Sequence, residues 1–461
     1  MGEPVALLLA TDEGVRMDSG IPDPQRWVPA AQPLCGRPVG RYPVEAARRA
    51  GVARVIGVAG SGAEQVRAVL GADLEYVHQE LHSGDAWAIR QAAPLLEGFV
   101  GPILVLRANA PLIDSQALQG LLARHHDTGA VATLLTVRAA GPAGEWRSER
   151  RPDGTVARIV PGESGDTSAG GAREMDAGCA VFHAPALLAC LARLSAEDRN
   201  ASLPHVVETL AQEGQRVEAV LHPDPLLAMA IHDRVDLARA AAVLRGRILE
   251  RHMRAGVTVV DPATTYVDIE VEIEPEATVQ PLTFLHGRTH IGRGAEIGPM
   301  TRIVDARIGE RAQVLCSVVT ESEVGEECRI GPYAQLRPGC RLGKGVKVGN
   351  FVELKNAIVE DRVAMSHLSY IGDAFVGERT NIGAGTITCN YDGKAKHPTR
   401  IGRGAFIGSH ATLIAPVEIG DGAYVAAASP VHENVPPDAL AIARCRQTVK
   451  EGWAKKRREG E

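Results

Sequence analysis

Residues 324–354 read VGEECRIGPYAQLRPGCRLGKGVKVGNFVEL, and an aliphatic residue recurs at every sixth position of this stretch. The same spacing returns from Ile401 to Val425, and glycine follows many of these aliphatic residues directly. A period of six matches neither an amphipathic helix nor an alternating strand. It is typical of a solenoid of short parallel strands in which each coil turns three corners. We therefore expect a left-handed β-helix from Gly256 to about Pro430, with glycine at tight corners because it tolerates positive φ.

The first 229 residues alternate strand-like runs with helical stretches, which predicts a mostly parallel sheet covered on both faces. The expected strands are 5–10, 54–59, 102–106, 131–137 and 179–182, and the expected helices are 44–50, 63–70, 85–96 and 115–124. Residues 145–171 are polar and Gly-rich, so we expect an irregular surface excursion there. A helix from Asp233 to Met253, with Val235, Ala238, Ala241, Leu244 and Ile248 on its apolar face, is expected to link two domains.

Composition narrows the class of protein. A chain of 461 residues with a net charge of −6 has no basic footprint for nucleic acid, so no nucleic-acid partner is expected. Its eight cysteines show no CxxC spacing, which argues against a zinc cage, and Cys316, Cys328 and Cys340 are expected at small corner positions of the solenoid. With no leader-like start and no apolar run of about 20 residues, we expect a cytoplasmic protein without membrane insertion.

Residues 335–393 carry polar blocks that the coil period does not require. They are Leu336-Arg337-Pro338-Gly339, Asn350-Phe351-Val352-Glu353-Leu354-Lys355, Ser366-His367-Leu368-Ser369-Tyr370, Asn381-Ile382-Gly383-Ala384-Gly385 and Thr388-Cys389-Asn390-Tyr391-Asp392-Gly393. Their side chains extend over about two and a half coils, and residues one or two coils apart lie close together on a solenoid. We therefore expect them to converge on one groove.

These blocks resemble those of the bacterial bifunctional proteins that acetylate glucosamine 1-phosphate and then couple the product to UTP, giving UDP-N-acetylglucosamine. The resemblance spans almost the whole chain in organisation and residues 335–453 motif by motif. It implies an α/β nucleotidyltransferase-like (Rossmann-like) domain at 1–229, a helical linker at 230–255, and a left-handed parallel β-helix acetyltransferase domain with a C-terminal tail at 256–461. It further implies acetyl-CoA as co-substrate and a homotrimer with its acetyltransferase sites between neighbouring subunits.

The resemblance also assigns roles to single residues. His367 matches the catalytic base and Glu353 the carboxylate that orients its imidazole. The matches to the sugar-phosphate ligands are Arg337, Lys355, Tyr370, Asn381 and Lys396, and the matches to the acetyl-CoA contacts are Ala384, Asn390, Tyr391, Ser409, Ala427 and Arg444. Guanidinium and ammonium groups suit a phosphate. Taken singly, His367 would be an ordinary surface histidine, and Ser409 and Ala427 would be corner packing. No metal ligand is expected among these residues.

The first domain departs from the family's pattern. Where the family has Leu-Ala-Ala-Gly-x-Gly-Thr-Arg-Met, the chain has Leu9-Ala10-Thr11-Asp12-Glu13-Gly14-Val15-Arg16-Met17. A carboxylate at Asp12 repels a polyanion by roughly 1–4 kcal/mol at 4 Å, and a phosphate cradle relies on bare backbone N–H groups. The other departures are Asp23 for the phosphate-binding lysine, Asp85 and Ala86 after the retained Gln79 and Gly84, Arg107-Ala108-Asn109 for Tyr-Gly-Asp, His232 for a metal-holding asparagine, and Trp146, Pro161 and Asp176 in the sugar pocket.

These departures predict a first domain that is silent as a uridylyltransferase. Magnesium is disfavoured because Asn109 and His232 replace the expected ligands. The predicted function is transfer of acetyl from acetyl-CoA to glucosamine 1-phosphate, for UDP-N-acetylglucosamine and cell-envelope synthesis. Two alternatives remain open at this point: a bifunctional enzyme in which displaced residues supply the metal and phosphate contacts, and a non-catalytic trimeric scaffold or nucleotide-binding protein.

Overall fold

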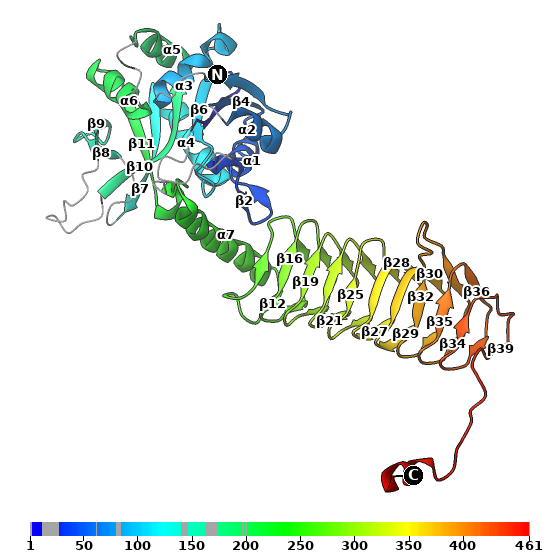
Figure 1. Cartoon of the computed structure of the whole chain (residues 1–461). Helices are drawn as coiled ribbons and strands as arrows, with labels where there is room; N and C mark the ends of the chain where they lie inside the picture. Colours follow the sequence, from blue (N-terminus) through cyan, green and yellow to red (C-terminus); the bar gives the residue numbers. More distant parts are fainter. Residues whose placement is uncertain are drawn as a thin grey trace. The chain divides into compact units, whose positions relative to one another are not determined.

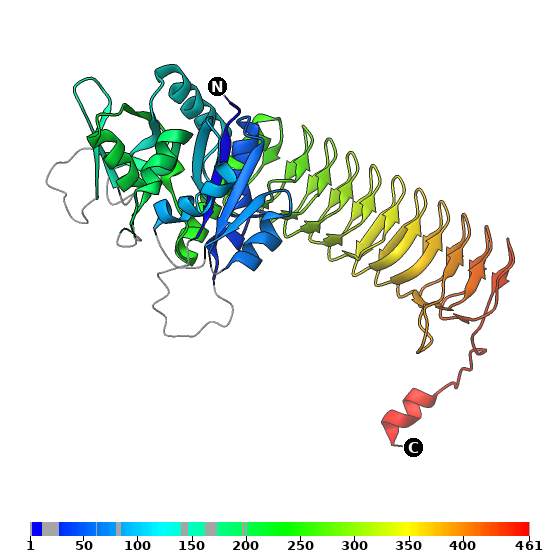
Figure 2. The ribbon, with the colours of Figure 1, turned by 90° about the horizontal axis from the view of Figure 1, so that it is seen from above.

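The computed structural model describes residues 2–11, 27–60, 62–79, 84–139, 146–161, 173–195, 198 and 201–460. They form two compact units, Met1–Leu244 and Arg245–Glu461, and the boundary falls inside helix α7 (Arg234–Arg254). Figure 1 and Figure 2 show the first unit as an α/β layered body and the second as a stack of coils. Each unit is described separately below.

A twisted sheet forms the centre of the first unit. Its strand order is β11-β7-β10-β6-β1-β4-β5, and β8 and β9 extend it from β10. The strands are β1 (Val5–Ala10), β4 (Arg54–Ala59), β5 (Glu75–His78), β6 (Pro102–Arg107), β7 (Ala132–Ala139), β8 (Trp146–Arg150), β9 (Val156–Pro161), β10 (Arg173–His183) and β11 (Val217–His222). Along the main path β10 runs antiparallel to β6 and β7, and the other neighbours are parallel. The expected mostly parallel sheet is confirmed.

Both faces of this sheet are covered by helices. One face packs against α1 (Arg41–Arg49), α2 (Ala63–Leu70) and α4 (Ser115–Thr128), and the other packs against α3 (Asp85–Gln91), α5 (Ala184–Ala192) and α6 (Leu203–Gln212). Strand β1 serves both layers, since Leu8 belongs to the first hydrophobic cluster and Leu7 and Leu9 belong to the second. Short elements complete the unit: β2 (Pro33–Leu34), β3 (Arg37–Pro38), η1 (Pro29–Ala31), η2 (Ala93–Leu96) and η4 (Pro225–Ala228).

Two expectations for the first 254 residues need correction. Part of the segment expected to be irregular forms the antiparallel pair β8–β9, because Val156 and Ile159 bury themselves in the cluster beneath α6. Helix α7 lies where the sequence predicts it, but Val235 is 56% exposed and the buried stripe runs through Ala240, Leu244 and Ile248. The predicted residues from Val235 to Leu244 are three apart, and each such step falls about 60° short of a full turn at 3.6 residues per turn. The start of the predicted face therefore winds away from the buried stripe.

The second unit is a parallel β-helix. Its 11-stranded sheet contains β12 (Thr258–Val259), β15 (Thr278–Val279), β18 (Glu296–Ile297), β21 (Gln313–Val314), β24 (Arg329–Ile330), β27 (Lys347–Asn350), β29 (Ala364–His367), β31 (Asn381–Ile382), β34 (Phe406–Ile407), β37 (Tyr424–Val425) and β39 (Leu440–Ala441). Its 17-stranded sheet contains β13 (Tyr266–Val267), β14 (Glu272–Ile273), β16 (Phe284–His286), β17 (His290–Ile291), β19 (Arg302–Val304), β20 (Arg307–Ile308), β22 (Val318–Thr320), β23 (Glu323–Val324), β25 (Gln335–Leu336), β26 (Arg341–Leu342), β28 (Glu353–Val359), β30 (Tyr370–Val376), β32 (Ile387–Cys389), β33 (Thr399–Ile401), β35 (Thr412–Ile414), β36 (Val417–Ile419) and β38 (Pro430–Val431).

The predicted period is confirmed by burial, and the fold is the left-handed β-helix of hexapeptide-repeat proteins. The aliphatic residues of the quoted stretch, from Val324 to Leu354, all lie in the core, as do those of the second run from Ile401 to Val425. Residues stacked in the 11-stranded sheet are 16–20 positions apart, except Asn381 and Phe406, which are 25 apart. The extra length is a loop at 390–398, closed by a bridge between Tyr391 and Lys396.

The glycines after the inward residues have a different role from the one expected. Gly331 does have a positive φ (100°), but Gly325 and Gly343 do not, and a positive φ falls instead on non-glycine corner residues such as Glu327 (58°). A Cβ on Gly325 would lie only 2.4 Å from the carbonyl oxygen of Gly343 in the next coil. Glycine is required there because successive coils approach too closely for a side chain.

The coil continues past the expected end at Pro430, to β39, and helix α8 (Trp453–Glu459) follows. All eight cysteines are free thiols: Cys328 and Cys340 are buried, and Cys316 is partly exposed at a corner with φ 43°. Among the described residues, no cluster of three or more His, Cys, Asp or Glu side chains could hold a metal ion. None of the helices in the described part of the chain combines the length and apolarity needed to span a bilayer.

Candidate functional site

Four of the predicted site residues gather on one flank of the β-helix, around β25, β28 and β30. In the stacked register Glu353 lies beside Tyr370 and Lys355 beside Gly372, and the backbone N–H of Arg337 donates to Leu354. A Cβ on Gly372 would lie 2.4 Å from the Tyr370 hydroxyl, so this glycine leaves room for the phenol to lie against the flank. The stacking of coils therefore brings these side chains together although they are far apart in sequence.

Charges on this flank are organised in ion pairs. The Arg337 guanidinium donates to the Glu353 carboxylate at 3.0 Å, and both side chains are about 40% exposed. The Lys355 ammonium donates to both oxygens of Asp373 at 3.0 and 3.1 Å. Burial alone would raise the pKa of Asp373, but hydrogen bonds from Asn356, Lys355 and Asn390 lower it. Asp373 is therefore an anion that fixes Lys355 in place.

Lys396 joins this group from the loop at 390–398. Its pKa is lowered because the Lys355 amine hydrogen-bonds to it and repels its charge, and Arg337 adds to the repulsion. The loop itself is held by Asp392, whose carboxylate accepts hydrogen bonds from the backbone N–H groups of residues 394 and 395 and from the His397 ring, each at 2.7 Å. We call Arg337, Lys355 and Lys396 the cation cluster. Three like charges held this close form an anion-binding surface.

His367 lies at the end of β29, at the corner next to this flank. Its Nδ1 is hydrogen-bonded to Oδ1 of Asn350, which is its stacked neighbour on β27. Glu353, which is expected to orient the imidazole, accepts a hydrogen bond from Arg337 at Oε1. In this structure Nδ1 of His367 contacts Asn350, and the orienting role of Glu353 stays a prediction.

A column of small residues continues from His367 along the same edge. Extending the register of β29, β31, β34 and β37 by two residues places Ala384, Ser409 and Ala427 in succession beyond His367. Backbone hydrogen bonds support this stacking: the N–H of His410 donates to Ala384 (2.7 Å), and the N–H of residue 428 donates to Ser409 (2.8 Å). Ser409 and Ala427 are exposed, so the column is a smooth, accessible track leading away from His367.

The remaining predicted residues lie around these two groups. Asn390 is buried and donates to Asp373, whereas Tyr391 is 61% exposed on the loop at 390–398. Asn381 lies on the flat face of the 11-stranded sheet beside Phe406, and not on the flank that carries the cation cluster. Arg444 is exposed in the segment after β39. A single copy of the chain therefore does not bring all the predicted residues into the one groove that the sequence predicts.

Sequence reasoning missed Asn350 and Asp373 as site residues. A signal for both exists in the coil length, because Asn350 lies one coil before His367 and Asp373 lies one coil after Asn356, the chain neighbour of Lys355. Reading polar residues in columns one coil apart would have paired them.

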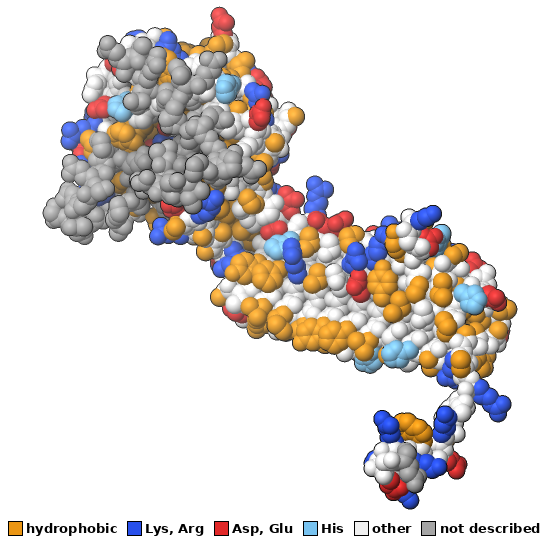
Figure 3. Space-filling view, viewed as in Figure 1, with side chains coloured by type: hydrophobic (Ala, Val, Ile, Leu, Met, Phe, Trp, Pro, Cys, Tyr) orange, Lys and Arg blue, Asp and Glu red, His pale blue; other side chains and the backbone are white. Residues whose placement is uncertain are grey.

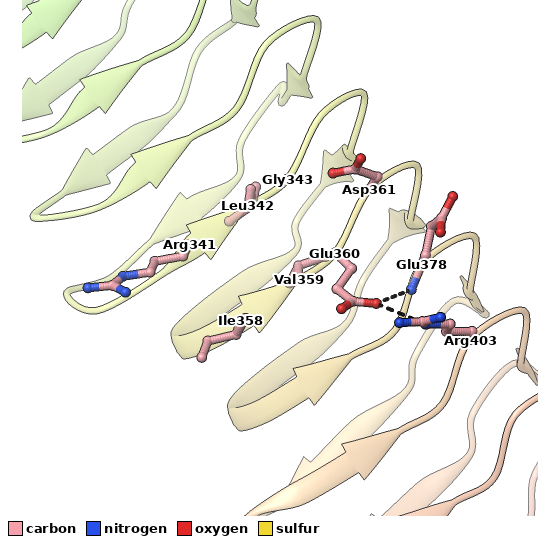
Figure 4. A pocket seen from close by; sticks show the side chains of 9 residues that line it. All are labelled: Arg341, Leu342, Gly343, Ile358, Val359, Glu360, Asp361, Glu378 and Arg403. Carbon is pink, nitrogen blue, oxygen red and sulfur yellow. Dashed lines mark hydrogen bonds and ion pairs between the residues drawn. The ribbon is translucent and has the colours of Figure 1, made fainter.

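Cavity size does not locate the site. A hollow of about 450 Å³ lies elsewhere on the coils, lined by Arg341, Glu360, Asp361, Glu378 and Arg403 among others. Figure 4 shows these side chains. Its charges satisfy one another: a Glu360 oxygen accepts from the backbone N–H of Glu378 at 3.0 Å and lies 3.7 Å from the Arg403 guanidinium. None of the predicted site residues lines this hollow.

In the first unit, residues that depart from the family's pattern contact one another. Arg107, the last residue of β6, makes an ion pair of 2.8 Å with Asp85 at the start of α3, and its side chain crosses Gly178. Asp176 is enclosed nearby, and burial raises its pKa to about 6 while Arg107 opposes the rise. The carboxyl end of the strands, where open α/β sheets bind ligands, thus contains a charge cluster built from Asp85, Arg107 and Asp176.

The positions that match the expected magnesium ligands carry an amide and an imidazole. The Asn109 side-chain amide donates to the Ile231 carbonyl at 3.3 Å, and its Oδ1 is buried without a hydrogen bond. His232 lies 3.7 Å from Asp236, and Trp146 packs edge-on against His205. Asp12, Val15 and Asp23 lie outside the described residues.

Comparison with known proteins identifies the family of the chain. Residues 321–356 match the family model described as "Bacterial transferase hexapeptide (six repeats)", and residues 398–428 match "Hexapeptide repeat of succinyl-transferase". A solved structure of UDP-glucose pyrophosphorylase complexed with UDP-glucose aligns with 53% of this chain and 100% of that chain, at a TM-score of 0.41 and 14% identity, which is too weak to carry an argument. The "Bifunctional protein GlmU" of a Geobacillus species is 40% identical over 97% of both chains, and that of Bacillus velezensis is 40% identical over 99% of both. At this identity over almost the full length, the chain belongs to the family of bifunctional GlmU proteins.

Proposed function

We propose that this protein transfers acetyl from acetyl-CoA to the amine of glucosamine 1-phosphate. The product, N-acetylglucosamine 1-phosphate, would enter UDP-N-acetylglucosamine and cell-envelope synthesis. The observation that carries the proposal is the cation cluster of Arg337, Lys355 and Lys396, which lies one corner away from His367. The reaction needs both features: a place for a phosphate dianion and a base for the attacking amine.

Phosphate recognition follows from the charges of the cluster. Its three cations face only two carboxylates, Glu353 and Asp373. A phosphate would relieve the repulsion that lowers the pKa of Lys396. Arg337 can bind two phosphate oxygens with its planar fork, whereas each lysine contributes a point charge. The Tyr370 phenol, held over Gly372, would contact the sugar ring.

Acetyl transfer is then a single proton-coupled step. The neutral amine attacks the thioester carbonyl, the new N–C bond forms, and the C–S bond breaks. His367 accepts the proton that leaves the amine, and the departing thiolate of coenzyme A takes up a proton. Histidine can accept a proton near neutral pH, and a positioned base contributes about 10²–10⁴ in rate.

The edge beyond His367 suits the long arm of acetyl-CoA. Ala384, Ser409 and Ala427 present small side chains and backbone along three coils. The exposed Tyr391 and Arg444 are candidates for contacts with the rest of the cofactor, and the cationic Arg444 suits its phosphates. The thioester would lie at the end of the track that is marked by His367.

A homotrimer is supported by an apolar ridge along one edge of the β-helix (Figure 3). The ridge comprises Leu282, Met300, Tyr333, Phe351 and Leu368, each with a positive φ and each at least 45% exposed. A left-handed conformation costs a non-glycine residue about 1–2 kcal/mol, and such a row of apolar side chains is typical of an interface. A neighbouring copy would also supply the Asn381 that the cation cluster lacks.

The free thiols suit a reducing cytoplasm, which we propose as the location.

Thiol release tests the acetyltransferase. Free coenzyme A is measured with acetyl-CoA in the presence and absence of glucosamine 1-phosphate, in the wild type, in His367→Ala and in Asn434→Ala. Asn434 is a matched surface control on the same β-helix, where its Oδ1 accepts a hydrogen bond from Glu418. We expect sugar-dependent release that disappears only in His367→Ala. No release from the wild type would exclude the enzyme and favour a non-catalytic scaffold.

We further propose that the first unit does not carry uridylyl transfer. The charge cluster of Asp85, Arg107 and Asp176 stands at the strand ends where a nucleotide would bind, and Asn109 and His232 are poor magnesium ligands. Incubation with UTP, magnesium and N-acetylglucosamine 1-phosphate should release no pyrophosphate above background. Clear turnover would show that displaced residues supply the missing contacts.

A further inference from the structure

The imidazole of His367 is held by an amide and not by a carboxylate. Asn350 and His367 occupy stacked positions on β27 and β29, and Oδ1 of Asn350 contacts Nδ1 of the ring. An amide oxygen only accepts hydrogen bonds, so the ring nitrogen that faces it must carry the proton. This leaves Nε2 as the unprotonated nitrogen, which is the tautomer that a general base needs.

The backbone around this pair allows little movement. The N–H of Leu368 donates to the Asn350 carbonyl at 3.0 Å, which joins the two coils immediately after His367. Immediately before Asn350, a Cβ on Gly349 would lie 1.9 Å from the Ser366 carbonyl oxygen. The coils therefore touch on both sides of the pair, and the two side chains are kept in hydrogen-bonding register.

We propose that Asn350 is the positioning residue for His367: it selects the Nδ1–H tautomer and directs Nε2 to the substrate amine. This inference rests on the proposed acetyltransferase function and deepens it. It also gives Asn350 the role that Glu353 is expected to have by resemblance, while Glu353 fixes Arg337 within the cation cluster.

A neutral partner has a chemical consequence. A carboxylate beside Nδ1 would stabilise the imidazolium and raise its pKa, so that more of the base would be protonated near neutral pH. An amide fixes the tautomer without adding this charge. Replacing Asn350 with aspartate should therefore keep the tautomer but change the pH at which the base becomes active.

The test compares Asn350→Ala, Asn350→Asp and the control Asn434→Ala in the thiol-release assay across pH. Asn350→Ala should lower kcat about 10–100-fold, as is common for groups that orient a reactive ligand, with KM for both substrates nearly unchanged. Asn350→Asp should recover most of kcat at high pH and move the acid limb of the profile upward by about one pH unit or more. The unfolding temperatures of the three variants show whether each is folded.

Contrary outcomes are distinct. Wild-type kinetics in Asn350→Ala would overturn the inference, while sugar-dependent release from the wild type would leave the proposed function intact. If Asn350→Asp is folded but as inactive as Asn350→Ala at every pH, an acceptor at this position is not what His367 needs, and the inference fails. If the wild type releases no coenzyme A, the proposed function itself fails.

Discussion

Replacing Asp176 by asparagine should stabilise the first unit at neutral pH. Asp176 is completely enclosed, one of its oxygens has no hydrogen-bond partner, and burial raises its pKa to about 6 although Arg107 opposes the rise. Relative to the ordinary value of 3.8, this shift corresponds to about 3 kcal/mol at 1.36 kcal/mol per pH unit. Asparagine mimics the protonated acid, so Asp176→Asn should gain up to about 3 kcal/mol at pH 7.5.

The sign of the pH dependence follows from linkage. Between about pH 4 and pH 6 the folded chain binds a proton at Asp176 that the unfolded chain has already released. This carboxyl therefore makes the free energy of unfolding fall as pH rises through that window, and the whole loss is present above pH 6. The difference between Asp176→Asn and the wild type should be near zero at pH 4 and should reach its full value at pH 7.

Tryptophan fluorescence during denaturant unfolding measures this difference. Trp27, Trp87 and Trp146 lie in the first unit, so a Trp453→Phe background restricts the signal to that unit. Asp127→Asn is the matched control, because the Asp127 side chain is 74% exposed. A difference that stays below about 0.5 kcal/mol at pH 7, or one that shrinks between pH 4 and pH 6, would refute the burial argument.

Three further predictions concern the β-helix, and a fourth concerns helix α7. Lys396→Ala should raise KM for glucosamine 1-phosphate about 10-fold with little change in kcat, because it removes one charge-assisted contact to phosphate; initial rates with varied sugar phosphate measure this. Ser409→Trp should block the track beyond His367 and raise KM for acetyl-CoA at least about 10-fold, with KM for the sugar unchanged in the same assay. Gly325→Ala should lower the free energy of unfolding by about 1–3 kcal/mol, because its Cβ would lie 2.4 Å from a backbone oxygen. Gly246→Ala in helix α7, where a Cβ meets nothing within 4 Å, should instead stabilise by about 0.5–1 kcal/mol in the same denaturation experiment.

The β-helix is predictable from sequence because its restraint is local and repeated. Each coil must bury an aliphatic residue such as Ile330 or Leu336, and the next coil stacks on it at nearly the same spacing. Contacts between successive coils are what the sequence does not predict. Gly325 is explained by the backbone of Gly343, eighteen residues away, and no local pattern reports that distance.

The same limit applies to the site residues. Sequence resemblance names His367 and Glu353, but their partners depend on which side chains the stacking places opposite them. The eighteen-residue coil between β25 and β28 stacks Glu353 on Gln335, and Glu353 reaches Arg337 diagonally. The seventeen-residue coil between β27 and β29 stacks His367 on Asn350. These pairings follow from coil length, which a motif does not report.

Two groups of charged residues differ in whether their charges satisfy one another. In the first unit Arg107 is paired with Asp85 beside the enclosed Asp176, so the charges at the strand ends are directed at one another. Together these residues form an internal charge cluster at the strand ends. On the β-helix the three cations of the cation cluster repel one another. This repulsion lowers the pKa of Lys396 although Glu353 pairs with Arg337 and Asp373 pairs with Lys355. An excess of positive charge beside an oriented imidazole is unfavourable for the protein alone and becomes favourable when an anionic group such as phosphate binds. This difference supports the acetyltransferase chemistry proposed for the second unit and the silence proposed for the strand ends of the first.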